Sequence, residues 1–374
     1  MGIYLLNIAI VFIFLYCAKF LGHNVIANNG KVIKRRNNKF FLWIALLSMM
    51  SVYALRYYVG TDFGGYYHSY LRLAESDMSL SEFLSSTEYR EKLYGILMYV
   101  CSQIFGAHWV PFAFVCAFLT YWPIMKVLNA NSTDITVSTL MYIFILAYFT
   151  GFNGVRQGIA EGLVALAFFE GLKKKKYVKY SILMFIAYEF HSTALIVIPV
   201  HILALLPFHS KPVRIGLIAG ASTVILLDSV WAKVINFLTE VGQDKLASDY
   251  AVLSDNGSSL LRLIVFALPL ILGVAFYYRL KREDDGTLDS ELVFMSFIVL
   301  MLFASMRNWI FARIGSYFNV GLVLFLPRLE CIFPSRNRSI GKWMIVLLYF
   351  AYMVALLLHG EGHLLPYQFI FGQT

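Results

Sequence analysis

Several ionisable side chains lie within long apolar stretches of this sequence or at their ends. Arg156 follows GFNGV, His191 lies in AYEFHSTAL, and Arg313 lies in MRNWIFARIGSYFN. Charged groups in such surroundings are costly, so they are candidates for function. Arginine binds phosphate bidentately at any working pH, and a histidine can accept a proton from a sugar hydroxyl. Together with nearby tyrosines suited to sugar faces, these residues describe a glycosyl transfer in which a lipid-linked pyrophosphate leaves.

Further polar residues extend this candidate set. They lie beside the three residues above or in the turn ALRYYVGTDFGGYY, and they are Arg56, Asp62, Tyr66, Gln157, Glu161, Glu189, Arg307 and Tyr317. For several of these residues, a purely structural role stays open as an alternative. Arg56 and Arg307 also fit arginines that reach lipid phosphate from the end of a span, and the tyrosines fit an aromatic belt at the membrane interface. Arg313 also fits a structural ion pair, and His191 a satisfied histidine at a helix end.

The composition says which elements must position these residues. The 374 residues are 59% hydrophobic and 14% charged, whereas a soluble domain has about 25% charged residues. The chain lacks the polar surface of a soluble enzyme, and it is too apolar for a disordered protein. We therefore expect an all-α, polytopic integral membrane protein with about twelve transmembrane helices, forming a single domain over residues 1–374.

The apolar runs place these spans in sequence. The expected spans are 2–22, 40–56, 109–128, 135–152, 155–172, 178–191, 193–209, 214–235, 260–279, 291–306, 312–328 and 341–359. The formal net charge of +9 comes from basic residues concentrated in short loops. The loop NGKVIKRRNNK (29–39) and the run KKKKYVK (173–179) are predicted to face the cytoplasm, because cytoplasmic loops are rich in Lys and Arg. Both termini and all the candidate residues then fall on or near the outer side.

Some segments do not fit the pattern of simple spans. Residues 57–106 are expected to form an outer loop, with a capping box in SLSE (79–82) and a short apolar segment, 92–105, that is re-entrant or lies in the interface. The acidic run EDDG (283–286) lies in a basic loop, so we expect it to be solvated rather than to bind a metal. The four cysteines form no CxxC pair, so the sequence signals no disulfide framework and no zinc site.

Four short blocks carry a family resemblance. They are R-Y-Y-V-G-T-D-F-G-G-Y (56–66), N-G-V-R-Q-G-I-A (153–160), F-H-S-T-A-L (190–195) and R-I-G-S-Y-F (313–318). Their order and approximate spacing, with a lysine-rich segment between the second and third blocks and a late P-Y-Q-F (366–369), resemble the EpsG/Wzy-type family of exopolysaccharide and O-antigen repeat-unit polymerases. The resemblance implies a glycosyltransferase of the C-type superfamily. Such an enzyme joins undecaprenyl-pyrophosphate-linked oligosaccharides on the outer face of the bacterial inner membrane, with no metal and no other cofactor.

The resemblance also suggests roles for the candidate residues. Arg56, Arg156 and Arg313 would hold the donor pyrophosphate, and His191 or Asp62 would be the catalytic base. Sugar or phosphate contacts would come from Gln157, Tyr66 and Tyr317, and supporting contacts from Glu161, Glu189 and Arg307. The expected partners are the lipid-linked oligosaccharides, membrane lipid and a chain-length regulator protein, and no nucleic acid. An O-antigen ligase, a flippase for the same lipid-linked saccharide and a membrane sugar O-acyltransferase stay open as alternatives.

Overall fold

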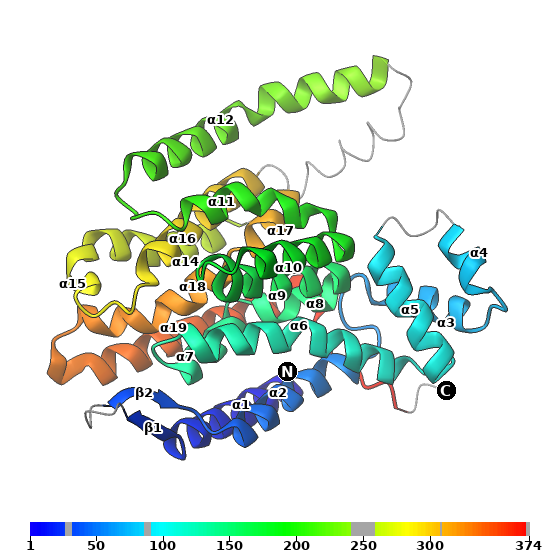
Figure 1. The fold of residues 1–374 in the computed structure, drawn as a ribbon, viewed down its shortest axis with the longest axis horizontal. Coiled ribbons are helices and arrows are strands. Elements are labelled where there is room, and N and C mark those ends of the chain that lie inside the picture. Colours follow the sequence, from blue (N-terminus) through cyan, green and yellow to red (C-terminus); the bar gives the residue numbers. More distant parts are fainter. Residues whose placement is uncertain (27–31, 86–90, 241–258, 307–308, 372–374) are drawn as a thin grey trace. The chain divides into compact units, whose positions relative to one another are not determined.

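The fold is helical, with one short β-hairpin. The computed structural model describes residues 1–26, 32–85, 91–240, 259–306 and 309–371 (Figure 1). The described helices form two compact units. Unit 1 comprises residues 1–195 and 343–374, and unit 2 comprises residues 196–342.

Unit 1 contains both chain termini and most of the candidate residues. Its helices and strands are α1 (Gly2–Phe20), β1 (His23–Ile26), β2 (Val32–Arg36), α2 (Lys39–Ala54), α3 (Phe63–Ala74), α4 (Leu80–Ser85), α5 (Lys92–Phe105), α6 (Trp109–Asn131), α7 (Ile135–Phe144), η1 (Ala147–Phe149), α8 (Thr150–Asn153), α9 (Val155–Ala167), the π-helix η2 (Phe168–Leu172), α10 (Tyr177–Phe190), most of α19 (Arg338–Leu358) and η7 (Glu361–His363). The strands β1 and β2 pair antiparallel.

Unit 2 lies between α10 and the main part of α19 in the sequence. After the 3₁₀ segment η3 (Ser192–Val197), which crosses the boundary, it contains α11 (Ile198–Leu203), α12 (Lys211–Glu240), α14 (Leu260–Ala275), α15 (Tyr277–Lys281), α16 (Leu288–Ser305), α17 (Ile310–Ser316), α18 (Asn319–Phe325), η5 (Leu326–Ile332) and η6 (Ser335–Asn337).

The described helices support a multi-pass membrane protein. Four are long and apolar enough to cross a membrane, namely Gly2–Phe20, Trp109–Asn131, Leu288–Ser305 and Ser335–Leu358. Two bent pairs raise this number to six if each pair is one span: α7 with η1 and α8, bent by 63°, and α17 with α18 and η5, bent by 52°. The expected spans 40–56, 193–209 and 260–279 fall on helices of 10–17 residues, shorter than the roughly 20 residues that a bilayer core requires. The number twelve stays a prediction.

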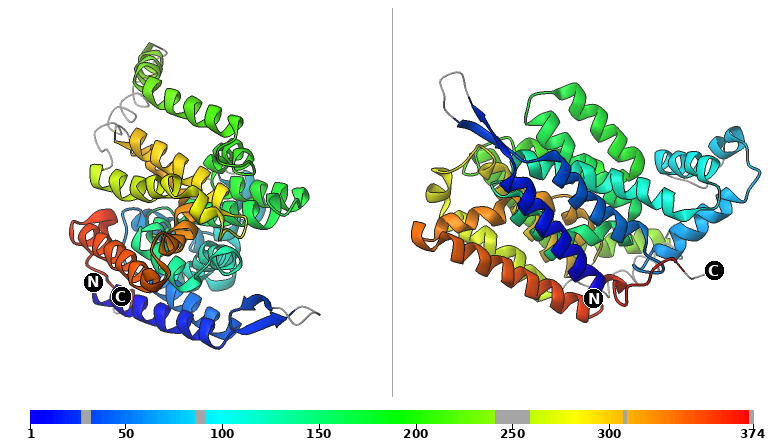
Figure 2. Two further views of the ribbon diagram at one scale, coloured as in Figure 1. Left: turned by 90° about the vertical axis from the view of Figure 1, so that its left-hand side faces the viewer. Right: turned by 90° about the horizontal axis from the view of Figure 1, so that it is seen from below.

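The helices of unit 1 bring two different sets of loops to its two ends. At one end the Nζ atom of Lys19 lies 2.8 Å from a carboxylate oxygen of Asp134. At the opposite end of α1, the Tyr4 hydroxyl donates a 2.8 Å hydrogen bond to the Leu364 carbonyl. The β-hairpin lies at the first end and α3–α5 lie at the second (Figures 1 and 2). Which of these ends faces the cytoplasm stays a prediction.

The capping box predicted at Ser79–Glu82 is present in the structure. The Ser79 amide donates to Glu82 Oε2 at 2.7 Å, and the Ser79 hydroxyl accepts from the Glu82 amide, which confirms the capping box. Hydrogen bonds to the Glu82 carboxylate from the Ser79 hydroxyl, at 2.7 Å, and from the Ser79 amide lower the pKa of Glu82. Helix α5 has 14 residues, about 21 Å at 1.5 Å per residue, and is too short to cross a hydrocarbon core of about 30 Å.

The acidic run in unit 2 is exposed at Glu283 and Asp285, as expected, but not at Asp284. The Asp284 side chain is only 2% exposed, rather than solvated, and lies between Lys281 at 2.8 Å and Arg328 at 3.5 Å. Its Oδ1 also accepts hydrogen bonds from the amides of Thr287 and Leu288, both at 3.0 Å. Asp284 thus satisfies amides at the start of α16, which would otherwise lack partners. The expectation was wrong at Asp284 because the neutralising Arg328 is distant along the chain.

Candidate functional site

One buried carboxylate joins two of the predicted residues. Glu91 directly precedes α5, and its side chain is 9% exposed. It forms an ion pair with the Nη1 atom of Arg156, and its Oε1 lies 3.4 Å from Nδ1 of His191. The two ends of the segment 91–191 therefore lie next to each other, with Glu91 between Arg156 and His191. A carboxylate in this place holds both an arginine and a histidine at one end of unit 1.

The local folding of α9 and α10 explains why Arg156 and His191 meet. Arg156 is the second residue of α9, after the break at Gly154, and His191 follows the last residue of α10 in extended conformation. The two helices pack against one another and are joined through η2 at their other ends (Figure 1). An antiparallel hairpin of this kind brings the start of its first helix beside the end of its second.

Aromatic rings border Arg156. Its Cζ atom lies 5.9 Å from the Tyr66 ring centroid and 6.0 Å from that of Tyr94, and the two rings meet edge-on. Rings at this distance attract a guanidinium. Arg156 is 38% exposed and His191 22% exposed, whereas the carboxylate between them is nearly covered. A ligand can therefore reach the arginine and the histidine but not the carboxylate that holds them.

Arg56 lies in a different environment. It is 1% exposed, and its Cζ atom lies 3.8 Å from the Tyr53 ring centroid and 4.5 Å from that of Phe152. Its Nη1 donates a 2.5 Å hydrogen bond to the Tyr53 carbonyl. The rings and this carbonyl stabilise the buried cation. The arrangement holds the end of α2 in place, and the guanidinium does not face solvent.

Asn153 organises the glycine-rich turn after Arg56. Its Oδ1 accepts a 2.8 Å hydrogen bond from the Thr61 amide. Gly60, whose φ is +99°, lies so close that an added Cβ would be 2.7 Å from the same oxygen. The C-terminal segment closes over this turn, since the Gly60 amide donates to the His363 carbonyl at 3.0 Å. The half-buried Asp62, at the start of α3, accepts a 3.0 Å hydrogen bond from the Thr61 hydroxyl.

The next residues are one predicted sugar or phosphate ligand, Gln157, and two predicted supporting residues, Glu161 and Glu189. Gln157 and Glu161 are buried, and the amide of Gln157 donates a 3.0 Å hydrogen bond to the carboxylate of Glu161. Glu189 is half-buried, and in the part of the chain that the structure describes it forms no ion pair with an arginine. The candidate Arg156 instead pairs with Glu91, which sequence reasoning missed. Its one visible signal was its place just before the short apolar segment 92–105.

The remaining predicted residues belong to unit 2. Arg313 lies on α17, with its Cζ atom 4.2 Å from the Trp309 ring centroid. Tyr317 follows the last residue of the same helix and is 3% exposed. Both lie where α17 meets α18 in a bent pair. Arg307 lies outside the described residues. The roles of Arg313 and Tyr317 as pyrophosphate and sugar ligands stay predictions.

Comparisons with known proteins bear on the identity of the chain. The model of the EpsG family matches residues 39–369, a range that contains the four blocks, Glu91 and the late P-Y-Q-F. No curated protein and no solved structure matches the chain. With its apolar helices, the match identifies a multi-pass membrane protein linked to polysaccharide biosynthesis. The chain belongs to the EpsG family.

Proposed function

We propose that this protein is an oligosaccharide repeat-unit polymerase of the inner membrane. It joins undecaprenyl-pyrophosphate-linked repeats into O-antigen or exopolysaccharide, with its active site on the outer side. The observation that carries this proposal is the Glu91 carboxylate between Arg156 and His191. An accessible arginine suits the leaving pyrophosphate, and an accessible histidine suits the attacking hydroxyl.

In the proposed reaction, an acceptor sugar hydroxyl attacks the anomeric carbon of the donor repeat. The new glycosidic C–O bond forms as the C–O bond to the pyrophosphate breaks. The hydroxyl proton passes to His191, and undecaprenyl pyrophosphate leaves with the bonding electron pair. Arg156 stabilises the charge that develops on that group. Glu91 touches neither substrate. It orients His191 and stabilises the imidazolium, as a third group commonly does for a catalytic base.

A reconstitution assay separates this proposal from its alternatives. Purified protein in liposomes is given lipid-linked repeats extracted from its own cells, and products are resolved by length. We expect ladders of two or more repeats together with released undecaprenyl pyrophosphate. Transfer of repeats across the bilayer without lengthening would instead identify a flippase. Transfer to an added lipid A core without self-lengthening would identify a ligase.

The proposed sidedness has its own test. Single cysteines at positions 62 and 175, in a background without the four native cysteines, are exposed in intact cells to a thiol reagent that does not cross membranes. We expect labelling at position 62 and none at position 175 until the cells are opened, because lysine-rich turns face the cytoplasm. Labelling of position 175 from outside would contradict the proposed location of the site.

A further inference from the structure

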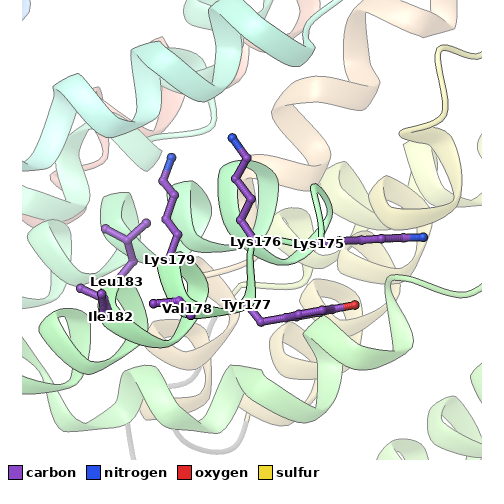
Figure 3. Close-up of a pocket in the computed structure, with 7 residues that line it drawn as sticks. All are labelled: Lys175, Lys176, Tyr177, Val178, Lys179, Ile182 and Leu183. Carbon is purple, nitrogen blue, oxygen red and sulfur yellow. The ribbon is translucent and has the colours of Figure 1, made fainter.

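The lysine-rich turn between η2 and α10 opens into a surface pocket of about 670 Å³. Its lining consists of Lys175, Lys176, Tyr177, Val178, Lys179, Ile182 and Leu183 (Figure 3). Figure 3 shows Lys176 and Lys179 pointing the same way, with Lys175 and Tyr177 running alongside one another. The pocket lies at the end of α10 opposite to His191, so nothing in the proposed reaction uses it.

The backbone of this turn is held in a fixed form. The Lys175 amide donates to the Leu172 carbonyl and the Lys176 amide to the Gly171 carbonyl, both at 2.9 Å. Lys175 adopts φ of +56°, the left-handed conformation that side-chain-bearing residues rarely take. Together with this left-handed residue, the two hydrogen bonds form a Schellman motif, which ends the helix at a defined point. The turn thus presents its lysines from a defined backbone rather than from a loose loop.

The charges in the turn are only partly balanced. The Nζ atom of Lys174 lies 2.5 Å from one oxygen of Glu170, and that of Lys179 lies 4.0 Å from the other. For Lys175 and Lys176, both exposed, the described residues supply no acidic partner. The pocket therefore contains two positive charges that no carboxylate described here neutralises. This surplus favours an anionic ligand.

The other aliphatic side chains that line the pocket are largely exposed. Val178 is 76% exposed and Ile182 is 54% exposed. Their four-residue spacing places them on one face of α10, and Phe185, 62% exposed, continues that face toward the other end of the helix. A soluble anion needs no such surface, and a neutral lipid needs no surplus of lysines. The two features together fit an amphiphile with a charged head and a hydrocarbon chain.

We propose that this pocket binds one anionic phospholipid of the surrounding bilayer. The headgroup phosphate accepts hydrogen bonds from the ammonium groups of Lys175 and Lys176, and an acyl chain lies along Val178 and Ile182. Tyr177 lies at headgroup level, where amphipathic rings are favoured. Clustered lysines at a helix end next to lipid are typical of anionic headgroup recognition. This site is separate from the proposed catalytic one and does not depend on it.

Native mass spectrometry of the full protein in detergent tests the proposal. Phosphatidylglycerol and phosphatidylcholine with identical acyl chains are titrated separately, and the first bound lipid is quantified. We expect the wild type to prefer phosphatidylglycerol about 30-fold, as two lysine contacts imply. Lys175→Gln with Lys176→Gln should reduce this preference to about twofold or less. The matched control is Lys173→Gln with Lys174→Gln, which removes the same charge from the same run but outside the pocket lining.

The Lys173/Lys174 control variant and a soluble competitor separate specific lipid binding from attraction by net charge. Retention of the preference in the Lys173/Lys174 control supports the proposed site. Equal losses in both double variants would show that net charge alone attracts the lipid, and would overturn it. Glycerol 3-phosphate, which has the phosphate but no acyl chain, should not displace the lipid at equal concentration. Displacement by this compound, or equal binding of both lipids to the wild type, would also contradict the proposal.

Discussion

The Nδ1 atom of His191 lies 3.4 Å from the Oε1 atom of Glu91, although a hundred residues separate them in the chain. The same carboxylate pairs with Arg156, so one acidic side chain links a candidate base and a candidate phosphate ligand. This arrangement gives Glu91 a role that its neighbours in the sequence do not reveal. It also makes Glu91 the residue whose substitution is most informative about the proposed site.

Glu91→Gln is expected to lower the turnover number about tenfold or more, because the amide does not stabilise the protonated form of His191. The KM for the lipid-linked donor should change less than threefold. Loss of the ion pair should cost only about 1 kcal/mol of stability, since Arg156 is 38% exposed and screened by solvent. Glu75→Gln, at an exposed site after α3, is the control. A change confined to thermal stability would assign Glu91 a purely structural role.

Arg156→Lys keeps the positive charge but loses the paired N–H donors that match a phosphate. Loss of one charge-assisted hydrogen bond, worth roughly 1.5 to 3 kcal/mol, lowers the rate about 10- to 100-fold. Polymer length and yield, measured at matched protein level, check this expectation. The exposed Arg72 of α3 provides the control Arg72→Lys, which should be neutral. Normal polymer from Arg156→Lys would indicate that Arg156 serves only its ion pair with Glu91.

Gly60→Ala is expected to destabilise unit 1. The added Cβ would lie 2.6 Å from the Phe152 carbonyl oxygen, in a residue whose φ is +99°. Crowding against backbone together with the left-handed conformation should cost about 2 to 4 kcal/mol. Gly65→Ala on α3, where the new Cβ meets nothing within 4 Å, should be neutral or stabilising by up to about 1 kcal/mol. Thermal unfolding in detergent compares them, and equal midpoints would contradict the described turn.

Asp284 should make the stability of unit 2 sensitive to acid. Burial raises its pKa, but hydrogen bonds from Lys281 and the Leu288 amide, with the charge of Arg328, outweigh burial and lower it. A lowered pKa adds stability above the pKa of an unfolded aspartate, about 3.9, and that stability disappears as the pH falls through the folded value. The thermal midpoint of wild type should therefore fall below about pH 4 more steeply than that of Asp284→Asn. Parallel curves would refute this assignment.

The sequence predicted the helical, multi-pass class and the family, because both depend on local composition and on ordered short motifs. It also predicted that Arg156 and His191 lie at one end, because two consecutive helices must return the chain to that end. The bends within the spans could not be predicted from the sequence. Hydropathy, for example, does not detect the break at Leu146, whose φ is +65°. That break divides one expected apolar run into a bent pair.

Two features of the site depend on tertiary packing that no local pattern encodes. Arg56 resembles an exposed arginine at the end of a span, yet Tyr53 and Phe152 enclose it from α2 and α8. Glu91 resembles one more acid in a polar loop, and its partner Arg156 is 65 residues away. In both cases the decisive neighbours come from other helices. The sequence therefore identified Arg56 as a candidate without its surroundings, and it did not identify Glu91.

The rate of a single transfer in His191→Ala, compared with Asp62→Asn, tests the central claim most directly. Reconstituted protein is saturated with lipid-linked repeat, and formation of the first glycosidic bond is followed alongside binding of undecaprenyl pyrophosphate. If His191 is the base, His191→Ala should lower the rate about 100-fold or more while binding changes less than threefold. In the wild type the Asp62 carboxylate contacts the Thr61 hydroxyl. The variant Asp62→Asn should retain most of the rate. Full activity of His191→Ala, with loss of activity in Asp62→Asn, would contradict the account and assign the base to Asp62.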